Sequence, residues 1–231
     1  MKEQHSQGTA GGRLRAAIFG INDGLVTNAS LVVGVAAAEP GRQVVVLAGI
    51  AGLVAGAFSM AAGEYISMTV QREMFESQIA LERRELEDDP EGERHEVAVI
   101  FRAKGLNVED ADRIAESVMA EPEVALDLMA REELGLNPDD LGSPWGAAIS
   151  SFIAFAAGAA VPLVPYILFG GITAMLASLA LAGLVMMGVG GLTARLSHRS
   201  PIFGAVRALL IGAVATGVTY VVGRIVGVAV T

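Results

Sequence analysis

Pairs of glutamates three residues apart occur twice between residues 67 and 143. Glu82 and Glu85 form the first pair, and Glu93 and Glu96 form the second. In a helix, side chains at this spacing lie on the same face. If the two helices fold into an antiparallel hairpin, the four carboxylates converge. Clustered carboxylates bind hard or borderline divalent cations such as Mn²⁺ and Fe²⁺, and they repel one another unless a cation or protons are present.

A methionine and a further glutamate follow at helical spacing. Met129 and Glu133 are four residues apart and therefore share a helix face. A thioether is a softer ligand than a carboxylate, which favours Fe²⁺ over Mg²⁺ or Ca²⁺. The alternative is that all these glutamates lie on solvated helix faces, with Arg83, Arg84 and Arg94 as their ion-pair partners, and that Met129 is a core residue.

An enzyme of the ferritin-like di-iron type is not expected. Such a site needs Glu-x-x-His pairs on bundle helices. The residue three positions before His95 is Gly92, and no such pair occurs elsewhere in the chain. We therefore predict that the protein is not an enzyme, and that His95 is an exposed neighbour rather than a ligand.

The chain that carries these residues is too apolar for a typical soluble domain. Of its 231 residues, 53% are hydrophobic and the mean hydropathy is +0.54. Residues 43–63 and 141–194 contain no charge, and one membrane span needs about 20 apolar residues. We predict an all-α membrane protein with five transmembrane helices, at about 16–38, 44–66, 146–161, 167–193 and 202–226. The third of these is expected to break at "PLVP" (residues 162–165).

The charges are concentrated between the second and third spans. Residues 69–143 hold 21 acidic and 8 basic side chains, and the remainder holds 4 acidic and 8 basic ones. The predicted domains are residues 1–66 with the first two spans, an acidic helical module at 67–143, and residues 144–231 with the last three spans. The second span is expected to continue into the module as one helix, which ends at "DDPEG" and is followed by shorter helices over 93–104, 108–119 and 122–134.

Two carboxylates lie inside the predicted spans. They are Asp23 on the first span and Glu64 near the end of the second, with Met60 one helical turn from Glu64. Intramembrane ionisable residues generally face a bundle interior or an aqueous cavity and mark ion or proton pathways. The alternatives are snorkelling of Glu64 to the interface and a hydrogen bond between Asp23 and a polar partner on a neighbouring helix.

Small residues surround Asp23 and recur on the second span. Gly20 and Gly24 form a G-x-x-x-G pair, and Gly52 and Gly56 form another. Such pairs permit close contact between helices in a membrane. Self-association through the first span would bring two copies of Asp23 together, which is a hypothesis.

Basic residues near the span ends predict the orientation. Cytoplasmic ends of membrane spans carry an excess of Lys and Arg. With five spans, the N-terminus, the module and the turn after the fourth span lie on one side, which we predict to be cytoplasmic. The basic residues on that side are Lys2, Arg13, Arg15, Arg72, Arg195, Arg199 and Arg207.

Several of these segments together resemble one known family. From about Arg15 onward, the chain is similar to the vacuolar iron transporter family, the iron and manganese transporters of plant and yeast vacuoles and their prokaryotic relatives. The resemblance is carried by "DGLVTNASLVVGV", "SMAAGEYIS", "RRELE", "PEGERHEVAVIFRAKGL", "MAREELGL", "SPWGAAISSF" and "PLVPY", in this order.

The resemblance implies a homodimer of five-span subunits with a cytoplasmic metal-binding domain between the second and third spans. It implies export of metal from the cytosol in exchange for protons, along a pathway lined by the first spans. Asp23, Met60 and Glu64 match pathway positions of the family. The metal-site positions of the family correspond to Glu82, Glu85, Glu93, Glu96, Met129 and Glu133.

Our prediction from sequence is therefore a transporter of divalent iron, manganese or both. The bound and transported ion is Fe²⁺ or Mn²⁺, with Zn²⁺ as a further candidate, and neither a prosthetic group nor a nucleic-acid partner is expected. Ala130 stands where plant members can carry a second methionine, so the choice between Fe²⁺ and Mn²⁺ stays open. The alternative is a membrane-anchored sensor or buffer that binds metal without transport. With fourteen arginines and two lysines, we expect a prokaryotic inner membrane, or a vacuolar membrane in a eukaryote.

Overall fold

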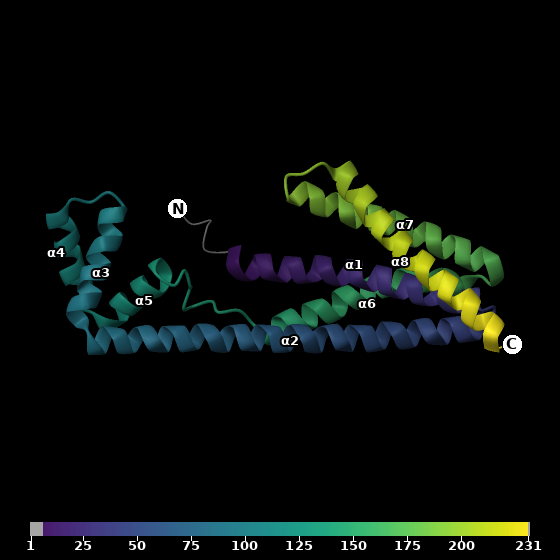
Figure 1. The fold of residues 1–231 in the computed structure, drawn as a ribbon, viewed down its shortest axis with the longest axis horizontal. Coiled ribbons are helices and arrows are strands. Elements are labelled where there is room, and N and C mark those ends of the chain that lie inside the picture. Colours follow the sequence, from purple (N-terminus) through teal and green to yellow (C-terminus); the bar gives the residue numbers. More distant parts are fainter. Residues whose placement is uncertain (1–6, 231) are drawn as a thin grey trace. The chain divides into compact units, whose positions relative to one another are not determined.

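The structure is a computed structural model that describes residues 7–230, with side chains described from Ala16 to Gly227 and at Ala229. These residues form eight helices and no strand, so the all-α prediction is confirmed (Figure 1). The helices are α1 (Gln7–Ala37), α2 (Arg42–Asp88), α3 (Pro90–Ala103), α4 (Val108–Met119), α5 (Pro122–Glu132), α6 (Pro144–Leu168), α7 (Gly171–Leu196) and α8 (Pro201–Val230). Lys2 lies outside the described residues, as do the side chains of Arg13 and Arg15.

Five of the described helices are long and apolar enough to cross a membrane, as predicted. They are α2, α6 and α7 together with the segments Ala16–Ala37 and Pro201–Gly227 of α1 and α8. α2 is one uninterrupted helix of 47 residues, which confirms that the second span continues beyond its apolar part (Figure 1). No Pro or Gly occurs between Ser67 and Glu87 to end it.

The chain divides into two compact units. One contains Ile66–Ser143, with the end of α2 and helices α3 to α5; the other contains Ala10–Tyr65 and the chain from Pro144 onward. In the second unit α7 and α8 pack along each other. Its core is built largely from small residues that let helices approach closely, as is common in membrane bundles.

Local capping determines the helices of the first unit. Asp89 alone separates α2 from α3; its side chain accepts a hydrogen bond from the Gly92 amide, and Pro90 occupies the first turn. Figure 1 shows α3 turning away from α2 and not running back along it, so the antiparallel hairpin on which convergence of the four carboxylates was conditioned is not formed. A one-residue linker is too short to bring two helices side by side at 8–10 Å.

The prediction that the third span breaks at "PLVP" is wrong. α6 continues through Pro162 and Pro165 to Leu168, and both prolines are buried. A proline lacks the amide hydrogen that would bond the carbonyl oxygen four residues earlier in the helix. Two neighbouring helices hold α6 along this segment: Ser178 Oγ of α7 donates to the carbonyl oxygen of Pro162 at 2.7 Å, and Asn28 Nδ2 of α1 donates to that of Ala159 at 2.6 Å.

The G-x-x-x-G pair of the first span is used within the chain. A Cβ atom on Gly24 would lie 2.2 Å from the carbonyl oxygen of Phe155, and one on Gly20 would lie 2.9 Å from Cβ of Ala154. Both glycines therefore pack against α6. They are not available for a contact with the first span of a second copy, which corrects that part of the hypothesis.

Substitution of Gly24 by alanine is expected to destabilise the helical bundle. The added methyl group would displace the backbone of α6 at Phe155, and overpacking of this kind costs about 1–3 kcal/mol. The measurement is the Tm of the protein in detergent, which falls by about 2–4 °C for each kcal/mol in a chain of this size. Gly188→Ala is the control, because a Cβ atom there meets nothing within 4 Å. Equal Tm values for the two variants would contradict the packing argument.

Candidate metal site

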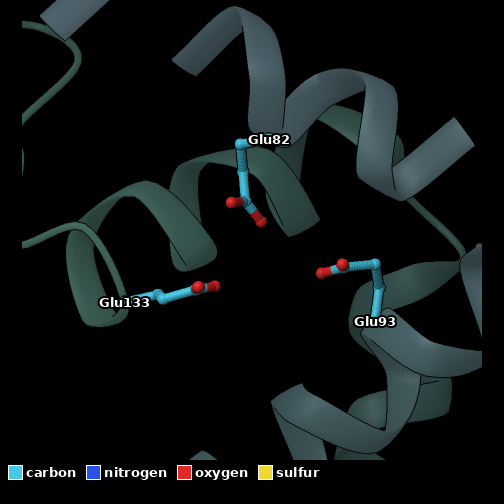
Figure 2. A group of neighbouring side chains, drawn as sticks. All are labelled: Glu82, Glu93 and Glu133. Atoms are coloured by element: carbon cyan, nitrogen blue, oxygen red, sulfur yellow. The ribbon is translucent and has the colours of Figure 1, made fainter. Parts of the chain in front are cut away.

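Three glutamates from three parts of the first unit face one another. Glu82 lies on α2, Glu93 on α3 and Glu133 directly after α5. One carboxylate oxygen from each residue lies within 4.8 Å of the other two. Figure 2 shows the three carboxylates pointing into a common space. This geometry suits a divalent cation held by oxygen ligands.

Two of the three carboxylates are buried and incompletely hydrogen-bonded. Glu82 is 2% exposed and Glu93 is 9% exposed, whereas Glu133 is exposed. Oε1 of Glu82 and Oε2 of Glu93 have no hydrogen-bond partner. A buried carboxylate without a partner is costly, so it must take up either a proton or a cation. The alternative, in which these two residues lie on solvated helix faces, is therefore wrong for Glu82 and Glu93.

The same environment raises the pKa of all three groups. Burial, followed by the charges of Glu133 and Glu93, raises the pKa of Glu82 from 4.5 to about 7. Burial, followed by the charges of Glu96 and Glu133, raises the pKa of Glu93 to about 7. The pKa of Glu133 is also raised, mainly by burial. At neutral pH the cluster is thus poised between binding protons and binding a cation.

The second glutamate of each predicted pair lies at the surface of the unit and not at the buried centre of the cluster. Glu85 and Glu96 are exposed, yet their charges contribute to the raised pKa of Glu82 and Glu93. The structure thus brings all five predicted carboxylates into one electrostatic neighbourhood, with Glu82 and Glu93 at its buried centre. His95 is exposed, as predicted.

The arginines near the cluster do not neutralise its buried members. Arg83 forms a two-pronged contact with Glu123, at 2.6 and 3.1 Å, and Arg94 pairs with Glu91 at 3.1 Å. The solvated-face alternative requires both arginines as ion-pair partners of the glutamate pairs. Because Arg83 and Arg94 contact other carboxylates, neither of them neutralises the negative charge of Glu82 or Glu93.

Met129 lies in the core of the first unit. Its side chain is fully buried and packs in a cluster with Val97, Ala98 and Ala115. This is the arrangement expected for a core residue, and the role of its sulfur as a ligand stays a prediction. Glu133 follows four residues later, and its amide donates to the carbonyl oxygen of Met129 at 2.9 Å.

Without metal, the first unit is expected to lose stability as the pH rises. In the unfolded chain these carboxyl groups have a pKa of 4.5, and in the fold Glu82 and Glu93 keep their protons up to about pH 7. Between these values the folded state binds more protons, so the free energy of unfolding falls as pH increases and levels off above about pH 7. The measurement is amide hydrogen exchange in α3 and α5, corrected for intrinsic rates. Protection that increases from pH 5 to pH 8 would contradict this assignment.

The predicted pathway residues all lie in the second unit. Asp23 is half-buried on α1, and its Oδ1 accepts a hydrogen bond from Thr27 Oγ1 of the same helix at 3.2 Å. It shares an i, i+4 row with Thr27 and Phe19, both exposed. Met60 is half-buried and packs beside Ala57 and Phe155, and Glu64 is half-buried on α2. The contact seen for Asp23 is thus within its own helix, not with a neighbouring one.

Sequence reasoning missed an ion pair in the second unit. Arg224 Nη1 lies 2.6 Å from Oε1 of Glu39, which is 185 residues away in the chain. Arg42 donates from Nε to the carbonyl oxygen of Tyr166 at 2.9 Å and from Nη2 to that of Ile167. An arginine inside the last predicted span was the available signal, because such residues are rare and are usually paired.

Comparison with known proteins places this architecture in a family. The model of the VIT family matches residues 14–224, which is most of the chain. The chain belongs to the VIT family. The resemblance to vacuolar iron transporters is thereby confirmed, and this VIT-family chain is a multi-pass membrane protein of a transporter family.

Named relatives of this VIT-family chain cover nearly all of it. A vacuolar iron transporter of Acanthamoeba castellanii is 36% identical over 230 residues, which is 96% of this chain and 81% of the relative. Vacuolar iron transporter 1 of Arabidopsis thaliana is 29% identical over 219 residues, covering 94% and 88%. Vacuolar iron transporter homolog 1 of Oryza sativa is 35% identical over 219 residues, covering 93% and 74%.

Proposed function

We propose that this protein moves divalent iron, manganese or both out of the cytosol in exchange for protons. The observation that carries the proposal is the group Glu82, Glu93 and Glu133, whose carboxylate oxygens meet within 4.8 Å while two of the residues are buried. The names of the relatives, vacuolar iron transporters, support iron as the cargo. Zn²⁺ is a further candidate cargo.

In this proposal the unit at residues 67–143 is a cytoplasmic metal-binding domain. Oxygen ligands from Glu82, Glu93 and Glu133 hold the cation, and Glu85 and Glu96 supply negative charge from the rim. Binding removes the mutual repulsion of the carboxylates and releases the protons that their raised pKa values retain. Capture of the cation is therefore coupled to proton release at the site.

Two copies of the chain are proposed to form the pathway through the membrane. Asp23 lies on a stripe of α1 that its own chain leaves half-covered, and a charge at the bilayer centre costs about 2.5–3.5 kcal/mol on insertion scales. A second copy facing this stripe would remove Asp23 from lipid. Because Gly20 and Gly24 already pack on α6, the facing surface consists of Phe19, Asp23 and Thr27 instead.

The cargo is then passed from the metal-binding domain to Met60 and Glu64 and on to Asp23. A carboxylate can hold either a proton or a cation, so Asp23 can exchange one for the other as the two ions move in opposite directions. The orientation follows from the basic residues at the span ends, with the domain in the cytoplasm. The membrane is the inner membrane of a prokaryotic cell in this proposal.

The deciding experiment measures metal and proton movement together. The full-length protein is reconstituted into liposomes with an internal pH reporter, and Fe²⁺ (under anaerobic conditions) or Mn²⁺ is added outside. Metal uptake accompanied by a rise in internal pH, in excess of protein-free liposomes, is expected. Uptake without proton movement would indicate an uncoupled channel. Binding without uptake would indicate a membrane-anchored sensor or buffer, the alternative function.

A further inference from the structure

A polar cavity opens at one end of the membrane bundle, away from the residues that the transport proposal uses. Its volume is about 450 Å³, and it lies where α1 ends, α2 begins, α6 ends and α7 begins. Because these helix ends are ends of candidate membrane spans, we infer that the cavity lies at the depth of lipid headgroups. The polar side chains that line it are Glu39, Arg42, Tyr166, Tyr220 and Arg224.

The polar cavity carries an excess of positive charge. Two guanidinium groups line it, and Glu39 is the one carboxylate that lines it among the described residues. Glu39 pairs with Arg224, whereas the contacts of Arg42 are to the backbone carbonyl oxygens at the end of α6. The one positive charge in excess favours an anion over a cation as the occupant, because guanidinium groups recognise phosphate oxygens well.

An apolar groove continues from the polar cavity. It has a volume of about 410 Å³ and lies between α1, α7 and α8. Met175 and Tyr220 line both spaces, so the two adjoin. The rest of the groove is formed mainly by small and aliphatic side chains, among them Ala29, Leu179, Ala182 and Leu209. Inorganic phosphate would occupy only a small part of the cavity and would leave this groove without an occupant.

We propose that the polar cavity and the apolar groove together bind one anionic phospholipid. The phosphate lies against Arg42 and Arg224, and an acyl chain occupies the groove between α1, α7 and α8. Tyr166 also lines the cavity. Its hydroxyl group is buried without a hydrogen-bond partner and is a further polar group at this end. The bound lipid would connect the α1–α2 turn to α7 and the end of α8.

The test measures lipid binding to the purified full-length protein by native mass spectrometry in detergent. The probes are phosphatidylglycerol, phosphatidylcholine with identical acyl chains, and inorganic phosphate. Phosphatidylglycerol is expected to bind about tenfold or more tightly than phosphatidylcholine, and inorganic phosphate is expected not to displace it. Equal affinity for both lipids would overturn the proposal, and so would displacement by inorganic phosphate, which would indicate a free-anion site.

Two variants separate the charged half of the site from the apolar half. Arg224→Gln removes one guanidinium group, and Gly217→Phe fills the groove at a position where a Cβ atom meets nothing within 4 Å. Each is expected to weaken phosphatidylglycerol binding about tenfold or more. Arg224→Lys keeps the positive charge, so its affinity for phosphatidylglycerol should fall less than that of Arg224→Gln. This variant keeps the test decisive if Arg224→Gln does not fold.

Matched controls carry the same chemical changes elsewhere. Arg199→Gln alters an exposed arginine in the turn between α7 and α8, and Gly188→Phe adds an aromatic ring at an exposed position of α7 with equal space. Both should bind phosphatidylglycerol as the wild type does. Retained binding in Gly217→Phe, or equal loss in Gly188→Phe, would show that the apolar groove is not the acyl-chain site.

Discussion

Asp23→Asn is expected to abolish metal-coupled proton movement and to reduce metal flux by about 10–100-fold. Asparagine has nearly the same shape and keeps an oxygen that can accept the hydrogen bond from Thr27 Oγ1. The substitution therefore removes the charge and the titratable site while leaving the local contact in place. Loss of a charge-assisted interaction with the cargo costs about 1.5–3 kcal/mol, which corresponds to this range. The measurement is metal uptake and internal pH in proteoliposomes.

Two comparisons make the Asp23 result specific. Thr27→Val removes the hydrogen bond and keeps the carboxylate, so its flux should stay near that of the wild type. The metal affinity of the glutamate cluster, measured by titration of the Asp23→Asn variant in detergent, should be unchanged, because Asp23 and this cluster belong to different units. Wild-type metal flux with wild-type proton movement in Asp23→Asn would refute the role proposed for this residue.

Glu82→Gln is expected to have two effects of opposite sign. It should weaken Mn²⁺ and Fe²⁺ binding by about 10–100-fold, since a charged ligand is lost. At pH 7.5 it should also stabilise the metal-free unit, because the wild-type carboxylate is 2% exposed and one of its oxygens has no partner. Calorimetric titration with Mn²⁺ measures the first effect, and amide hydrogen exchange in α3 and α5 measures the second.

The opposite signs distinguish a binding residue from a structural one. Glu116→Gln is the matched control: it makes the same change at an exposed glutamate of α4 in the same unit and should alter neither quantity. A purely structural Glu82 would behave differently, with stability falling in the glutamine variant and metal affinity following only indirectly. Unchanged affinity in Glu82→Gln would remove Glu82 from the metal site.

The features that the sequence predicted well depend on interactions between near neighbours in the chain. The continuous α2, the helix at Val108–Met119 and its cap at Asn107, which accepts a hydrogen bond from the Asp110 amide, all follow from local propensity and capping. Long apolar runs likewise predict spans without knowledge of their partners. The i, i+3 spacing of the glutamates also indicated which side chains share a face.

Tertiary packing decided which of those glutamates matter most. Glu82 and Glu85 share a face by spacing, yet Glu82 is buried and Glu85 is exposed. Helical periodicity gives a face, but it does not say which residue of that face another helix covers. In the same way, Gly20 and Gly24 predicted a close helix contact, and only the structure identified α6 as the partner.

The family, the five spans and the set of acidic residues were thus determined by the sequence alone. Only the tertiary structure decided three further features: the course of α6 through Pro162 and Pro165, the burial of Glu82 and Glu93, and the pairing of Glu39 with Arg224. Each of these depends on groups far apart in the chain, whose approach is set by helix packing and not by the spacing of residues along one element.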